Sequence, residues 1–145
     1  MLLDDIKAQW EIDCVIDKSK LDDESIKSPT LYAKYLSFHI ENKVKSSSLR
    51  YEIAVLKSNK YSWYQGRLSK NKLADLEWEQ YQFTKPNKGE LEQLMDNDID
   101  LINLKYKLEH LETSIAVLEL ILINIKDRTW SIRNAITFKQ FEAGL

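Results

Sequence analysis

The sequence predicts an all-α fold built from long helices. Three glycines and two prolines interrupt its 145 residues, so few positions favour the tight turns that β-strands need. Apolar side chains recur every three or four residues over long stretches, which is the period of an amphipathic helix. With 43% hydrophobic and 30% charged residues, the chain is too apolar to be disordered and too polar to lie in a bilayer. Its length fits one domain, spanning residues 1–145.

Residues 1–27 form an acidic N-terminal segment. Within it Leu2, Leu3, Ile6 and Trp10 follow helical spacing and predict a short amphipathic helix, whereas residues 14–16 are expected to be extended. The segment carries more acids than lysines, its acids being Asp4, Asp5, Glu11, Asp13, Asp17, Asp22, Asp23 and Glu24.

A long helix is expected over residues 28–65. Ser28 can cap its first turn and Pro29 suits the first helical position, while Gly66 is a plausible end. The connection at 66–89 is expected to hold a short helix at 73–81 and then a turn at 85–89, where proline, asparagine and glycine cluster. The apolar positions of the long helix are Leu31, Tyr35, Phe38, Leu49, Ile53 and Leu56.

Residues 90–145 predict a coiled-coil-like assembly helix, whose apolar seam is interrupted only by Asn97, and a final helix at 130–141. Between residues 115 and 125 the other faces are apolar as well, so we infer that neighbouring subunits cover them in a ring-shaped oligomer. An ordinary bundle core within one chain explains this stretch equally well. The predicted oligomerisation residues are Leu108, Leu111, Ile115, Leu118, Leu122, Ile125, Ile132 and Ile136.

The segment from residue 53 to residue 74 contains no acid and interleaves cations with aromatic rings. Single-stranded DNA needs cations for its phosphates and planar side chains for its unstacked bases, so this segment is a candidate DNA-binding site. A solvated helix end beside an aromatic core is the alternative. The candidate residues are Lys57, Lys60, Tyr61, Trp63, Tyr64, Arg67, Lys70 and Lys72.

Two further charged regions are less specific. Lys126, Arg128, Arg133 and Lys139 surround Trp130 and either extend the DNA-binding site or complement the carboxyl end of the long helix. Residues 75–100 are rich in acids, so they are expected to avoid DNA and to be solvated or paired with basic regions of a neighbour.

Known catalytic and cofactor motifs are missing. His39 and His110 stand far apart without a metal-ligand spacing, and no Walker-type or dinucleotide-binding glycine loop occurs, so no metal, cofactor or catalytic residue is expected. The remaining alternatives to DNA binding are a coiled-coil adaptor that binds only proteins and, less well supported, a nuclease or other hydrolase with scattered carboxylates.

Short motifs along nearly the whole chain resemble the UvsY family of phage recombination mediators. Each motif is weak alone, but their order and spacing together are specific. They are Asp13-Cys14-Val15-Ile16-Asp17 with Lys20-Leu21, Leu31-Tyr32-Ala33-Lys34-Tyr35-Leu36, Leu49-Arg50-Tyr51-Glu52, Trp63-Tyr64-Gln65-Gly66-Arg67, Ile125-Lys126-Asp127-Arg128 and the closing Phe141-Glu142-Ala143-Gly144.

The resemblance implies a phage-encoded protein of the infected host's cytoplasm that assembles as a ring of about seven subunits and binds single-stranded DNA. It further implies that the protein contacts the phage single-strand-binding protein and a UvsX-like recombinase, loads the latter onto DNA, and hydrolyses no ATP. In the family, two basic residues that stand two positions apart precede the aromatic pair and are implicated in DNA binding. Here Lys60 matches one of them, but Ser58 occupies the other place and Lys57 lies one residue earlier.

Overall fold

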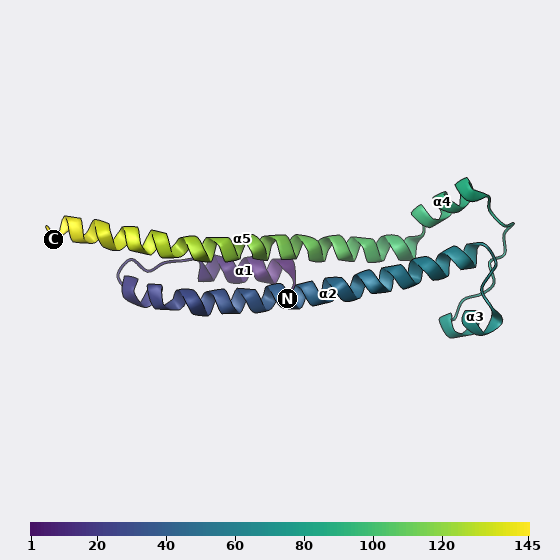
Figure 1. Cartoon of the computed structure of the whole chain (residues 1–145), viewed down its shortest axis with the longest axis horizontal. Coiled ribbons are helices and arrows are strands. Elements are labelled where there is room, and N and C mark those ends of the chain that lie inside the picture. The colour runs from purple at the N-terminus through teal and green to yellow at the C-terminus, as the bar shows by residue number, and fades with distance from the viewer. The chain divides into compact units, whose positions relative to one another are not determined.

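The computed structural model describes residues 1–145 and contains helices as its only regular elements (Figure 1). The helices are α1 (Leu3–Asp13), α2 (Leu21–Tyr64), α3 (Lys70–Leu76), α4 (Lys88–Asp96) and α5 (Ile99–Glu142). The predicted all-α class is therefore confirmed. No helix combines the length and apolar character needed to cross a membrane.

The chain packs as two compact units, to which α2 and α5 both contribute. Unit 1 comprises residues 1–45 and 110–145, and unit 2 comprises residues 46–109. In unit 1 the short helix α1 lies beside α2 and α5 (Figure 1). The buried core of unit 1 joins all three helices and consists of Ile6, Tyr35, Leu118, Ile121, Leu122 and Ile125.

Helix α2 begins earlier than the sequence pattern predicts. It starts at Leu21, so Pro29 lies inside the helix and not in its first turn. The true first turn holds Asp22, Asp23 and Glu24, whose negative charges suit a helix amino terminus. Leu21 and Glu24 are also buried in unit 1, and these contacts offset the backbone hydrogen bond that Pro29 cannot donate.

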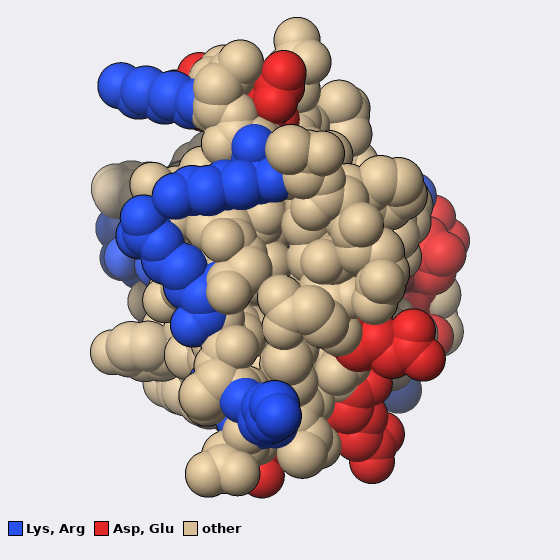
Figure 2. All heavy atoms as spheres, turned by 90° about the vertical axis from the view of Figure 1, so that its right-hand side faces the viewer, with Lys and Arg blue, Asp and Glu red and all other residues tan.

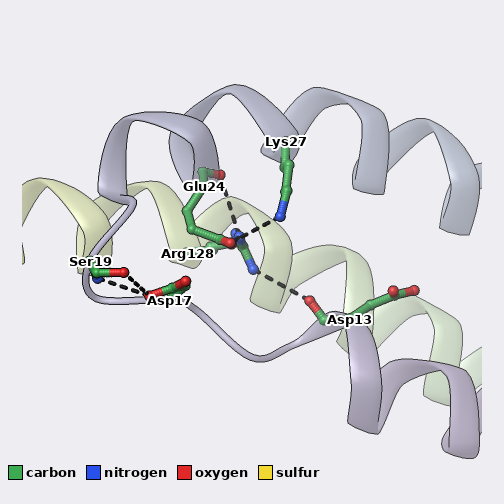
Figure 3. A network of polar contacts seen from close by, with 6 residues as sticks. All are labelled: Asp13, Asp17, Ser19, Glu24, Lys27 and Arg128. Atoms are coloured by element: carbon green, nitrogen blue, oxygen red, sulfur yellow. Dashed lines mark hydrogen bonds and ion pairs between the residues drawn. The ribbon is translucent and has the colours of Figure 1, made fainter.

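Arg128 of α5 organises a buried polar network in unit 1 (Figure 3). Its guanidinium donates to the backbone oxygen of Asp13 at 3.4 Å, to the backbone oxygen of Glu24 at 3.3 Å and to the Glu24 carboxylate. Lys27 Nζ donates to the same carboxylate at 3.0 Å. Arg128 thus ties the end of α1 and the start of α2 to α5. It does not belong to an open basic patch around Trp130.

Helix ends in unit 2 follow local capping chemistry. Gly66 has a φ of 69° and lies two residues after the last residue of α2, where a helix end was predicted, and Asn97, which was expected only to interrupt the apolar seam, caps the end of α4. Helix α4 begins with a reciprocal pair in which the Asn87 side chain accepts from the Glu90 amide and the Glu90 carboxylate accepts from the Asn87 amide.

Two other expected helix boundaries differ from the structure. The short helix predicted at 73–81 is α3, which ends at Leu76 because Glu77 adopts the left-handed conformation, with a φ of 58°. Trp78 and Tyr81 thereby leave the helix and become free to pack on Trp63. The separate helix predicted at 130–141 is the continuation of α5, since no helix-breaking residue precedes Trp130.

Candidate nucleic-acid interface

Five aromatic side chains of unit 2, here called the aromatic cluster, pack around the end of α2. Trp63 has its ring centroid 5.0 Å from Tyr64, 5.8 Å from Trp78 and 5.1 Å from Tyr81. Tyr81 also contacts Tyr64 at 5.3 Å and Phe83 at 5.4 Å. The Trp63 indole N–H donates to the backbone oxygen of Glu79 at 2.7 Å. This packing fixes the carboxyl end of α2 against the connection that follows α3.

Lys60 lies inside this arrangement, with only 7% of its surface exposed. Its Nζ is 2.8 Å from Asp100 Oδ2 and 3.2 Å from Asp98 Oδ2. The same nitrogen sits 5.1 Å from the ring centroid of Trp63 and 4.8 Å from that of Trp78. Burial lowers the pKa of Lys60, but the two carboxylates outweigh burial and raise the pKa above its ordinary value. Lys60 is therefore a protonated, paired cation.

Asp98 connects Lys60 and Tyr64 of α2 to the start of α5. Its Oδ1 accepts from the amides of Asp100 at 3.0 Å and Leu101 at 3.1 Å, which caps the start of α5. Its Oδ2 accepts from the Tyr64 hydroxyl at 2.6 Å as well as from Lys60. Burial raises the pKa of Asp98, yet these donors together hold the pKa below its ordinary value. An ionised Asp98 thus joins α2 to α5 within unit 2.

The other predicted DNA-binding residues are exposed. Figure 2 looks at α3 and α4 from the right-hand side of Figure 1 and shows Lys and Arg side chains gathered along one side of this face, with Asp and Glu along the opposite side. Lys70 and Lys72 lie at the start of α3, where Ser69 caps the helix. We call the exposed members of the predicted set the basic surface: Lys57, Tyr61, Arg67, Lys70 and Lys72.

The structure therefore divides the predicted DNA-binding residues into two groups. Lys60 and Tyr64 are buried and Trp63 is half-buried, so these side chains, here called the framework, belong to the interior of unit 2. Sequence reasoning missed Asp98 and Asp100, because they lie in a stretch set aside as acidic. One local signal was available, since an aspartate followed by a long run of helical apolar spacing is a typical N-cap.

The predicted oligomerisation residues lie mostly inside unit 1. Ile115, Leu118, Leu122, Ile125 and Ile132 are buried in the monomer, whereas Ile136 is exposed. Leu108 and Leu111 are half-buried. Apart from Ile136, the apolar side chains that α5 leaves exposed in unit 1 lie outside the predicted set, and they are Leu120, Ile123, Trp130, Phe138 and Phe141. Most of the regularly spaced apolar residues predicted from the sequence thus form part of the chain's own core, whereas the additional apolar residues of α5 face outward.

No group of three or more His, Cys, Asp or Glu side chains is placed to hold a metal ion. The lone Cys14 is exposed and has no disulfide partner.

Comparison with solved structures shows the same fold in crystal structures of the bacteriophage T4 recombination mediator protein UvsY. One crystal form matches with a TM-score of 0.84 at 22% identity, covering 99% of this chain and 98% of the T4 chain. A second matches with a TM-score of 0.83 at 20% identity, covering 97% and 99%. No individually curated protein matches the sequence significantly.

At the level of sequence, the family described as "Recombination, repair and ssDNA binding protein UvsY" matches residues 9–145. The match includes the whole aromatic cluster, the basic surface and helix α5. It spans far more than half of the chain, and the structural matches extend over nearly the full length of both molecules. The chain therefore belongs to the UvsY family of recombination, repair and single-stranded-DNA-binding proteins.

Proposed function

We propose that this protein is a recombination mediator that holds single-stranded DNA on the basic surface. The observation that carries the proposal is the acid-free segment at 53–74, whose exposed cations stand on a rigid aromatic and ion-paired framework. Membership of a family described as binding single-stranded DNA supports it. Exposed cations gain affinity by displacing the counterions that surround phosphates.

Each part of the basic surface suits one part of the ligand. Lys57, Arg67, Lys70 and Lys72 are exposed cations that can follow a phosphate backbone, and Tyr61 is 51% exposed and offers a ring for base stacking. The framework residues Lys60, Trp63 and Tyr64 anchor the carboxyl end of α2, the helix that carries Lys57 and Tyr61.

Assembly of several subunits would combine weak DNA-binding sites into one surface of higher avidity. The outward apolar residues of α5 are proposed to pack between copies in a ring of about seven subunits, as the family resemblance implies. Repeating the basic surface around such a ring raises the effective concentration of sites along one strand. The ring would then compete with the phage single-strand-binding protein and load a UvsX-like recombinase, without catalysis, in the cytoplasm of the infected host cell.

Fluorescence anisotropy of a labelled oligothymidylate, measured against salt concentration, tests DNA binding. The double variant Lys57→Gln/Arg67→Gln should weaken binding and flatten the dependence of log affinity on log salt by about 0.7 for each lost phosphate contact. Lys7→Gln is the matched control, because Lys7 is an exposed lysine of α1 outside the basic surface. An unchanged slope in the double variant would refute the assignment of this surface.

The alternative, an adaptor that binds only proteins, draws support from the acidic side of the face in Figure 2, which suits a basic protein partner. Such an adaptor would show no salt-dependent affinity for the oligothymidylate even at low ionic strength. The anisotropy measurement on the native chain therefore separates the two functions.

A further inference from the structure

The segment that lacks acids in the sequence does not lack them in space. Helix α5 brings Asp98 and Asp100 to Lys60, so two carboxylates stand beside a cation in the middle of this segment. The two differ in their surroundings. The Asp98 side chain is 3% exposed and also holds Tyr64 and the first amides of α5, whereas the Asp100 side chain is 57% exposed.

Asp100 can leave Lys60 at little cost. An ion pair with one solvated partner gains little free energy, because water replaces the lost contact. The departure would not release Lys60 from its place, since Asp98 and the rings of Trp63 and Trp78 still hold the ammonium. The position vacated by the Asp100 carboxylate would suit another anionic oxygen.

We propose that Asp100 is a competing anion, which occupies Lys60 in the free protein and is replaced there by a phosphate of bound single-stranded DNA. The inference rests on the proposed DNA-binding function and adds a residue that limits its strength. Lys57 is exposed and lies three residues before Lys60 on α2, so a strand that contacts Lys57 lies about one helical turn from Lys60, whose ammonium carries the Asp100 carboxylate.

This exchange has a characteristic dependence on salt. In the native protein the Asp100 carboxylate stays close to Lys60 and offsets part of its charge, so a phosphate at Lys60 is only partly neutralised and releases few of its counterions. Without the Asp100 charge, Lys60 keeps Asp98 as its one carboxylate partner and neutralises a bound phosphate more fully, so that more counterions leave the DNA. Affinity and salt dependence should therefore rise together, which sets Asp100 apart from an acid that only repels DNA from a distance.

Asp100→Asn tests the proposal, with binding to the labelled oligothymidylate as the readout. The variant should bind about threefold to tenfold more tightly at low salt, and the log–log salt slope should steepen by about 0.7. Glu92→Gln is the matched control for net charge, since Glu92 is an exposed acid of α4. Asp100→Glu should retain the native affinity, because it restores a carboxylate near Lys60.

A double-mutant cycle identifies the cation that is involved. In a Lys60→Met background, Asp100→Asn should produce no gain beyond that of Glu92→Gln. An equal gain in the two backgrounds, or a native chain in which Asp100→Asn and Glu92→Gln behave alike, would overturn the proposal. If Lys60→Met fails to fold, the salt slopes of Asp100→Asn, Asp100→Glu and Glu92→Gln decide by themselves. Absence of salt-dependent binding in the native chain and in Asp100→Asn would instead refute the DNA-binding function.

Discussion

Each unit of the molecule contains one buried cation paired with acids, but the two pairs are enclosed to different degrees. In unit 1 the side chains of Arg128 and Glu24 are 4% and 6% exposed. In unit 2 Lys60 is equally buried, yet one of its two partners, Asp100, is largely open to solvent. Arg128 and Glu24 are both enclosed, although the exposed Lys27 also donates to Glu24, whereas the second pair has an acidic partner that water or another anion can replace.

This difference separates a structural ion pair from an exchangeable one. Removing one partner of a sealed pair leaves a charge without water or a counter-charge, which is costly. The planar guanidinium of Arg128 also serves three acceptors on α1 and α2 at once, a task that suits arginine. The compact ammonium of Lys60 can change one oxygen for another without new geometry. In unit 1 the buried cation holds three helices together, whereas in unit 2 the buried cation lies in the segment of the proposed DNA site.

The largest expected effect comes from breaking the sealed pair. Arg128→Met leaves the buried Glu24 carboxylate with the exposed Lys27 as its remaining cationic partner and should lower the free energy of unfolding by about 3 to 4 kcal/mol. Urea denaturation followed by circular dichroism measures the loss. Arg133→Met is the control, because Arg133 is an exposed cation of α5 that lies over the Trp130 ring, 5.2 Å from its centroid. Equal losses in the two variants would contradict a structural role specific to Arg128.

Asp98 should give the second largest effect, because it is the sealed half of the pair in unit 2. Asp98→Ala removes the cap of α5, the acceptor of the Tyr64 hydroxyl and one partner of Lys60, so we expect a loss of about 2 to 3 kcal/mol. Tryptophan fluorescence should report it, since Trp63 and Trp78 lie beside Lys60. Asp96→Ala, at an exposed acid that ends α4, should leave the urea midpoint nearly unchanged.

Acid should protonate the buried carboxylates of Glu24 and Asp98 and so weaken their ion pairs and hydrogen bonds. A hydrogen bond from Lys27 lowers the pKa of Glu24, burial opposes it, and Arg128 adds to the lowering. The pKa of Asp98 is also lowered. Groups with lowered folded-state pKa values stabilise the fold above the ordinary carboxyl pKa of about 4 and lose that contribution as pH falls through the folded values.

Stability should therefore be level between about pH 5 and pH 7 and fall below about pH 4, by up to about 1.4 kcal/mol per pH unit for each such carboxylate. Urea midpoints measured across this range check the prediction. Asp98→Asn should fall less steeply than the native chain, because its side chain cannot take up a proton there. An equal slope in the two proteins would show that Asp98 does not contribute.

The helices were predictable from sequence wherever a local signal determined them. The three-and-four spacing of apolar residues located α1, α2 and α5, and Gly66 marked the end of α2. The start of α2 was not predictable, because the contact that stabilises it joins Glu24 to Arg128 from the other end of the chain. Propensity alone favoured the serine and proline at 28–29.

The candidate site shows the same limit. Charge and aromatic content identified the segment around Lys60, but they gave all its cations equal weight. Whether a lysine is open or paired depends on residues distant in sequence, here Asp98 and Asp100. For the same reason the apolar positions of α5 were correctly identified as apolar, while their division between core and surface became visible only in three dimensions.

The smallest expected effect on stability is that of Asp100→Asn, and it sharpens the comparison most. The Asp100 carboxylate is solvated, and Lys60 keeps Asp98 as a partner, so the free energy of unfolding should change by less than about 1 kcal/mol. Urea denaturation of Asp100→Asn beside Asp98→Ala measures the contrast. If Asp100→Asn costs as much stability as Asp98→Ala, then Asp100 is as structural as Asp98. A phosphate could then replace it only by weakening the fold, which would remove the distinction between the sealed pair and the exchangeable one.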